Sequence, residues 1–84
     1  MSIDNANEAW ELAKNFTKLG YLYRANTCLD IAIENLINLS DKTNIKKVLI
    51  LLTKKIKLCQ RAKQDVTTKI AQRKLIKIYL YSTF

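Results

Sequence analysis

Apolar residues in the first half of the chain recur every three or four positions, which is the spacing of an amphipathic helix. The apolar face predicted for the first such segment, residues 7–19, consists of Ala9, Leu12, Ala13 and Phe16. Trp10 lies beside this face, and Gly20 follows at a place where a left-handed residue commonly ends a helix. We therefore predict a helix over residues 7–19 that ends at Gly20.

A second amphipathic segment covers residues 21–39. Its predicted apolar stripe consists of Leu22, Ala25, Cys28 or Leu29, Ala32 and Leu36. The two alanines are seven residues apart, and small side chains at that spacing let a neighbouring helix approach closely. The two segments are therefore expected to form an antiparallel helical hairpin around Gly20.

A third helix is predicted over residues 43–63, after a polar break at 38–44 in which Ser40 or Asp41 would cap it. Its predicted apolar seam consists of Ile45, Leu49, Leu52, Ile56 and Cys59. On the opposite side, within an arc of about 100°, lies a basic ridge made of Lys46, Lys47, Lys54, Lys57 and Arg61. The apolar residues left over, which are candidates for contact with a partner, are Ile50, Leu51 and Leu58.

The last segment, residues 66–84, begins with the helical spacing of Val66 and Ile70. Residues 75–81 also alternate with a period of two, which is typical of a strand. We predict a helix there, because the rest of the chain is helical and a lone strand would have no partner. A weaker break is expected near Gln64 and Asp65.

These segments predict an all-α fold: a small bundle made of an antiparallel hairpin and one or two further C-terminal helices. A chain of 84 residues is expected to form a single domain, 1–84. Its charge is unevenly divided. Residues 1–41 hold six acidic and three basic residues, whereas 42–84 hold twelve basic residues and one acidic residue. The acidic hairpin and the basic C-terminal part are expected to pair within one copy or between copies, as a homo-oligomer.

Composition argues against catalysis. The chain has no histidine, the commonest general base and metal ligand. Its two cysteines are too few for a zinc site made of cysteines alone, and its single glycine excludes a glycine-rich phosphate loop. We expect a protein that is not an enzyme and holds no cofactor or metal. No hydrophobic signal region begins the chain, so we expect a cytoplasmic location with both thiols reduced.

Residues 6–39 resemble a single tetratricopeptide repeat. The positions that match its pattern of large, small and turn-forming residues are Leu12, Ala13, Phe16, Gly20, Leu22, Ala25, Leu29 and Ala32. The stretch departs from the pattern at Ala9, where the family has a large residue, and at Ile37, where it has proline. No second copy follows. A three-helix bundle of the microtubule-interacting-and-transport type, or a hairpin outside any of these families, has similar spacing.

The resemblance implies a groove on the first helices that binds a peptide or helix of a partner protein. The residues that it places in this groove are Lys14, Asn15, Lys18 and Tyr21. We therefore expect a protein-interaction module, such as an adaptor, a chaperone-like protein, or an assembly or immunity factor. It would bury the apolar face of a partner helix, with charge setting the orientation.

The alternative function is non-specific binding of nucleic acid by the basic C-terminal half. Besides the basic ridge, the residues expected to follow the phosphates are Lys69, Arg73, Lys74 and Lys77. Tyr79, Tyr81 and Phe84 would then stack on bases. A membrane surface is the least favoured partner, because Trp10 lies in the acidic half of the chain.

Overall fold

The computed structural model describes the backbone of residues 3–82 and the side chains of residues 3–76. In this part the chain forms three helices and no strand: α1 (Ile3–Leu19), α2 (Leu22–Lys42) and α3 (Lys46–Ser82). The prediction of a small all-α bundle is confirmed.

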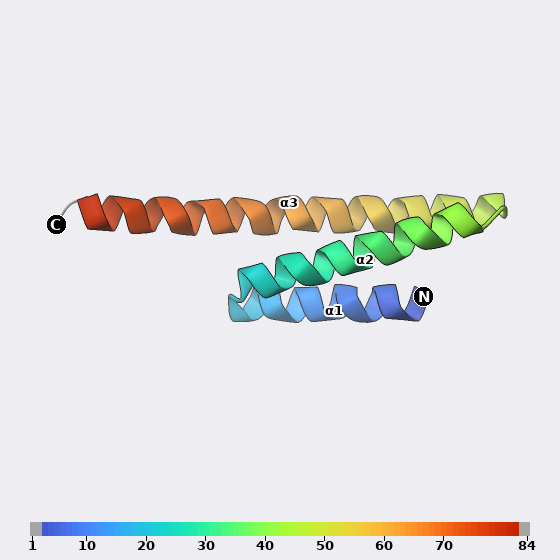
Figure 1. Ribbon diagram of the computed structural model, residues 1–84, viewed down its shortest axis with the longest axis horizontal. Helices are drawn as coiled ribbons and strands as arrows, with labels where there is room; N and C mark the ends of the chain where they lie inside the picture. Colours follow the sequence, from blue (N-terminus) through green and yellow to red (C-terminus); the bar gives the residue numbers. More distant parts are fainter. Residues whose placement is uncertain (1–2, 83–84) are drawn as a thin grey trace.

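The three helices lie side by side in a rod that measures 59 × 17 × 15 Å, with α2 between α1 and α3 (Figure 1). Both outer helices pack on α2, whereas α1 and α3 approach each other much less closely. With 37 residues, α3 is the longest helix and runs past the α1–α2 hairpin at its C-terminal end (Figure 1). The hairpin therefore covers one side of α3 and leaves the other open to solvent.

The turn between α1 and α2 has the hydrogen bonds of a Schellman motif. Gly20 has a φ of 85°, the left-handed conformation that only glycine adopts without strain. The Gly20 amide donates to the Thr17 carbonyl at 3.1 Å, and the Tyr21 amide donates to the Phe16 carbonyl at 2.8 Å. The Phe16 and Tyr21 rings also pack edge to face, with centroids 6.3 Å apart. The prediction that α1 ends at Gly20 is confirmed.

The second turn comes later than the sequence indicated. Ser40 and Asp41, predicted to cap the third helix, lie in the last turn of α2, where the Ser40 hydroxyl donates to the Ile37 carbonyl at 2.7 Å. The chain leaves the helix at Thr43, which has extended backbone angles. The Thr43 hydroxyl accepts a hydrogen bond from the Ile45 amide at 3.4 Å. The capping prediction was wrong because Ser40 satisfies a carbonyl of the helix that precedes it.

The break expected near Gln64 and Asp65 is absent, and α3 is continuous from Lys46 to Ser82. Cys59 and Val66, on either side of the expected break, are both buried and are seven residues apart, so one seam runs through it. The helix predicted for residues 75–81 is confirmed, because this stretch is the end of α3.

The α1–α2 interface is built from small side chains. Its buried alanines are Ala6, Ala9, Ala13, Ala25 and Ala32. Leu22, Leu29 and Leu36 of α2 are the large buried side chains beside them. Close approach of the two helices and the predicted stripe of α2 are thus confirmed. Leu12 was wrongly placed on the buried face, since 44% of it is exposed.

The α2–α3 interface uses larger side chains. Leu52, Cys59 and Val66 are buried at intervals of seven residues, and Val48, Ile56 and Ile70 pack around them. The predicted seam is correct at Leu52 and Cys59, but Ile45 is 62% exposed and Leu49 only half-buried. The seam that packs on α2 begins at Val48 instead and continues beyond residue 64.

Candidate interaction groove and basic ridge

A groove lies between α1 and α3, above the side chains of α2. It forms because both helices pack on α2 and leave space between themselves. Part of it is a cavity of about 340 Å³ with Leu29 of α2 among its lining residues. The other apolar lining residues are Trp10 and Ala13 from α1 and Ala62 and Val66 from α3.

Trp10 joins this cavity to a second one. The second cavity, of about 150 Å³, lies toward the start of α1 and is also lined by Trp10, together with Leu36, Leu58 and Cys59. Trp10 is the only tryptophan in the chain and is half-buried, with no hydrogen bond to its indole among those of the described residues. A large aromatic side chain in such a position is typical of the centre of a binding surface.

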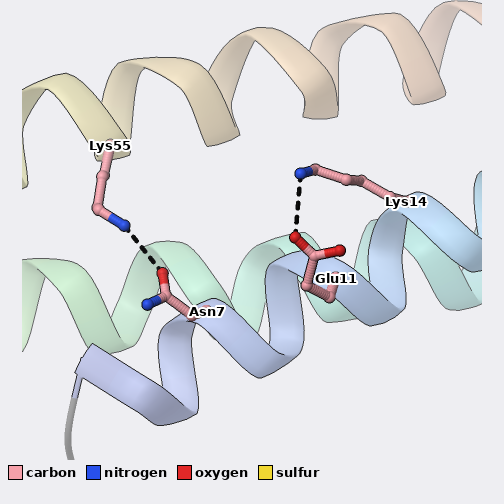
Figure 2. A network of polar contacts seen from close by, with 4 residues as sticks. All are labelled: Asn7, Glu11, Lys14 and Lys55. Carbon is pink, nitrogen blue, oxygen red and sulfur yellow. Dashed lines mark hydrogen bonds and ion pairs between the residues drawn. The ribbon is translucent and has the colours of Figure 1, made fainter.

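Basic side chains line the edges of the groove. Lys14 and Lys18 come from α1, and Lys69 comes from α3. The Lys14 ammonium lies 5.0 Å from the centroid of the Trp10 ring, within the range of a cation–π contact. It also pairs with Glu11, one turn earlier on α1, at 3.1 Å, and Figure 2 shows the Glu11 carboxylate pointing toward the Lys14 ammonium. Asp65 is the one acidic residue of the cavity lining.

Each end of the groove is bridged by one basic side chain of α3. Near the start of α1 the Lys55 ammonium donates to the Asn7 side-chain oxygen at 2.9 Å, and Figure 2 shows it reaching from α3 to α1. At the other end the Arg73 guanidinium donates to the Gly20 carbonyl at 2.7 Å. This carbonyl is at the C-terminal end of α1, where a helix favours positive charge. These two contacts mark the length of the groove.

The Cys59 thiol lies in the wall of the smaller cavity. Burial raises the pKa of this thiol above its ordinary value of 9.0, and the charges of Lys55 and Lys14 lower it by a smaller amount. A raised pKa keeps the thiol protonated and unreactive. Cys59 is not bonded to Cys28, which is half-buried on α2.

The partner-binding residues predicted from sequence are not gathered on one surface. Lys14, Lys18 and Leu58 line the groove. The other predicted positions are all exposed, and none of them lines the two cavities: Asn15, Tyr21, Ile50 and Leu51. Tyr21 is occupied in part, because its ring packs on Phe16 and lies beneath the Arg24 guanidinium.

On α3, sequence reasoning did not single out four residues that line the groove: Lys55, Ala62, Asp65 and Val66. The seam of α3, continued past residue 64 where a break was expected, is the signal that leads to Asp65 and Val66.

Eight of the eleven basic residues of α3 fall into two groups. Lys55, Lys63 and Arg73 face the hairpin, where Lys63 pairs with Asp30 of α2. The basic ridge faces away. Its five side chains are all exposed, and none of them has an ion pair or hydrogen bond within residues 3–76. Lys69 lies in the groove, Lys74 is exposed, and Lys77 is outside the described side chains.

The described residues contain no cluster of three or more side chains suited to hold a metal ion. Among them there is also no helix that combines the length and the apolar character needed to cross a bilayer.

Residues 1–81 match a protein family described as "Family of unknown function (DUF5475)", and the chain belongs to this family. It is 57% identical over 79 residues to the uncharacterized 9.5 kDa protein in the HE65-PK2 intergenic region of Autographa californica nuclear polyhedrosis virus. It is 43% identical over 79 residues to an uncharacterized 9.3 kDa protein of Orgyia pseudotsugata multicapsid polyhedrosis virus. Each match covers 94% of this chain and 96% of the relative. No solved structure matches the chain.

Proposed function

We propose that the protein is a non-enzymatic interaction module, of the adaptor or chaperone-like kind, that binds an acidic amphipathic helix of a partner protein in the α1–α3 groove. The observation that carries this proposal is the apolar groove itself, with Trp10 at its centre and lysines along its edges. The partner helix would lie on α1 and α3 and complete a four-helix bundle.

The dimensions of the groove suit a helix. Between its bridged ends at Asn7 and Gly20, α1 rises about 20 Å, the length of a helix of roughly 13 residues. Helix recognition of this kind uses apolar side chains three, four and seven positions apart. Two cavities in a line, one on each side of Trp10, supply separate pockets for such side chains.

The charge of the edges selects the kind of helix. Lys14, Lys18 and Lys69 lie along the groove, with Asp65 as the single opposing charge of the lining. Acidic residues beside the apolar face of the partner would therefore be attracted, and basic residues would be repelled. Such charges speed association and set orientation, whereas the apolar contacts supply most of the affinity.

The proposal is tested with three synthetic amphipathic peptides of about 18 residues. They share one leucine face and carry glutamate, glutamine or lysine beside it. Trp10 serves as the reporter, because it is the only tryptophan in the chain. We expect the glutamate peptide to shift Trp10 fluorescence to the blue in a saturable way, the glutamine peptide to bind more weakly, and the lysine peptide not to bind.

A matched pair of variants separates the groove from general attraction to a basic protein. Leu58→Gln changes the groove, whereas Ile31→Gln changes a similarly exposed apolar residue of α2 that lines neither cavity. Leu58→Gln should weaken binding of the glutamate peptide about tenfold, as expected for one buried leucine, and Ile31→Gln should leave it unchanged. Equal affinities of the two variants would contradict the proposal.

A further inference from the structure

We infer that the basic ridge of α3 is a second binding surface, separate from the groove, and that it binds the phosphates of duplex DNA. The groove and the ridge use different sides of the same helix. The inference goes beyond the proposed function and does not depend on it.

The packing of α3 determines where the ridge lies. Leu52, Cys59 and Val66 bury the inner side of the helix against the hairpin. At 100° per residue the ridge lies on average about 180° around the helix from these three residues. The ridge spans positions 46–61 and rises about 22 Å along the axis. Because the hairpin covers the opposite face of α3, the basic ridge faces solvent along the helix.

The positive charges of the ridge are not neutralised by ion pairs within the described residues. Its five cations have no carboxylate partner among the described residues, whereas Lys63, on the hairpin side, is paired with Asp30. The carboxylates described in ion pairs, Glu11 and Asp30, do not face the ridge, and Asp65, four residues after Arg61, is in none of the described ion pairs. A row of unpaired cations is the electrostatic footprint expected for binding a phosphate backbone.

The shape of the ridge favours duplex DNA over other nucleic acids. It is the convex side of one helix, and the major groove of B-form DNA, about 12 Å wide, admits a helix. The deep and narrow major groove of duplex RNA does not. Binding of single strands relies on aromatic side chains that stack on bases, and the ridge has none.

The residue types indicate binding without strong sequence preference. Four of the five cations are lysines, which act as point charges, and Arg61 is the one residue suited to bidentate contact with guanine. Lys54 and Lys57 lie toward opposite edges of the ridge, about 60° apart. They are therefore placed to reach the phosphates on the two sides of a groove, and contacts of that kind position a protein without specifying a base.

The test measures binding of the full chain to a labelled DNA duplex of mixed sequence, about 20 base pairs long, at several salt concentrations. Three to five phosphate contacts predict that log Kobs falls against log salt with a slope between about −2.7 and −4.5. The triple variant Lys54→Gln, Lys57→Gln, Arg61→Gln should make the slope shallower by about 2.7 and weaken binding roughly 100-fold at 0.1 M salt.

A control variant loses the same charge elsewhere. Arg24→Gln, Lys42→Gln removes two exposed basic residues that belong neither to the ridge nor to the lining of the groove, and its matched ridge variant is Lys54→Gln, Lys57→Gln. The control should bind DNA within about threefold of the unchanged chain, with an unchanged salt slope to within about 1. Circular dichroism of all the variants confirms that the helices remain. Equal losses in the two variants would show that net charge, and not the ridge, attracts DNA, and would overturn the inference.

Two further arms identify the ligand. A duplex RNA of the same sequence and vesicles containing phosphatidylserine should both bind more weakly than the DNA duplex. Equal or tighter binding of either ligand would overturn the assignment to DNA. The groove variant Leu58→Gln should bind DNA normally, so that failure of the groove proposal and failure of this inference are distinguished.

Discussion

α3 carries basic side chains on two opposite sides, and the two groups have different surroundings. On the side of the hairpin, Lys55, Lys63 and Arg73 reach Asn7, Asp30 and the Gly20 carbonyl. On the other side the basic ridge meets no partner within the described residues. The position of a basic residue relative to the apolar seam therefore decides whether it finds a partner on the hairpin. Basic residues on the seam side of α3 contact the hairpin, and those of the ridge remain unpaired within the described residues.

The apolar seam of α3 should contribute more to stability than any of its charged contacts. Leu52 is 2% exposed, and its neighbour Leu51 is 60% exposed. Leu52→Ala should lower the free energy of unfolding by about 2–4 kcal/mol, because it leaves a cavity between α2 and α3. Leu51→Ala should lower it by less than about 0.5 kcal/mol. Urea unfolding followed by circular dichroism measures both, and similar costs would mean that α3 docks through a different face.

Substitution of Gly20, in the turn that Arg73 contacts, should have the next largest effect on stability. A Cβ on Gly20 would lie 3.1 Å from an Arg73 guanidinium nitrogen. The backbone of Gly20 is also in the left-handed conformation. Gly20→Ala should therefore lower the free energy of unfolding by about 1–2 kcal/mol. Gly20→Asn should cost less, since asparagine tolerates this conformation better. Thermal unfolding of the two variants makes the comparison, and an equal or greater cost for asparagine would contradict the role given to φ.

A smaller effect compares one base from each side of α3. Lys63 pairs with Asp30 across a partly exposed interface, with 39% and 52% of the two side chains accessible. Lys63→Gln should lower the free energy of unfolding by less than about 1 kcal/mol, and less at high salt. Lys57→Gln should leave stability unchanged, because no partner is lost. A loss at Lys57 as large as that at Lys63 would show that the ridge is structurally engaged.

The smallest effect is one of pH. In the folded chain the pKa of Cys59 is raised above 9.0, chiefly because the thiol is buried. Below pH 9.0 the thiol is protonated in both states, so its contribution to stability is constant. Above pH 9.0 the unfolded chain loses the proton first, and stability falls as pH rises toward the folded pKa. Comparing Cys59→Ala with the unchanged chain between about pH 8 and 10 isolates the contribution of this thiol to the pH dependence of stability. The alanine variant should show the weaker decline.

The hairpin was predictable from sequence because its signals are local. Gly20 at the end of an amphipathic run, and alanines seven apart, specify a turn and a close helix contact without reference to the rest of the chain. The face of α3 was harder to place. Val48, Leu49 and Ile50 make its first turns apolar on several sides, so periodicity alone did not show which side meets α2.

The groove is a property of three helices together, and only parts of it were predicted. Lys14 and Lys18 were reached through a resemblance, and Leu58 through its surplus apolar character. Lys55 and Val66 were missed, because their place in the wall depends on how far α1 stands from α3. The basic ridge was visible in the sequence as a pattern. The sequence does not show whether these charges are paired, because that depends on which carboxylates lie near them in the folded chain.

The burial of Cys59 also makes α3 docking observable in time. Its side chain is 3% exposed, on the face of α3 that packs on the hairpin. A thiol-specific reagent can reach it only while that helix is lifted away. In the variant Cys28→Ala, Cys59 is the one remaining thiol. Its rate of modification at neutral pH therefore measures how often the interface between α3 and the hairpin opens under native conditions. A helix ligand seated in the groove should slow that rate, and DNA on the opposite side should leave it unchanged.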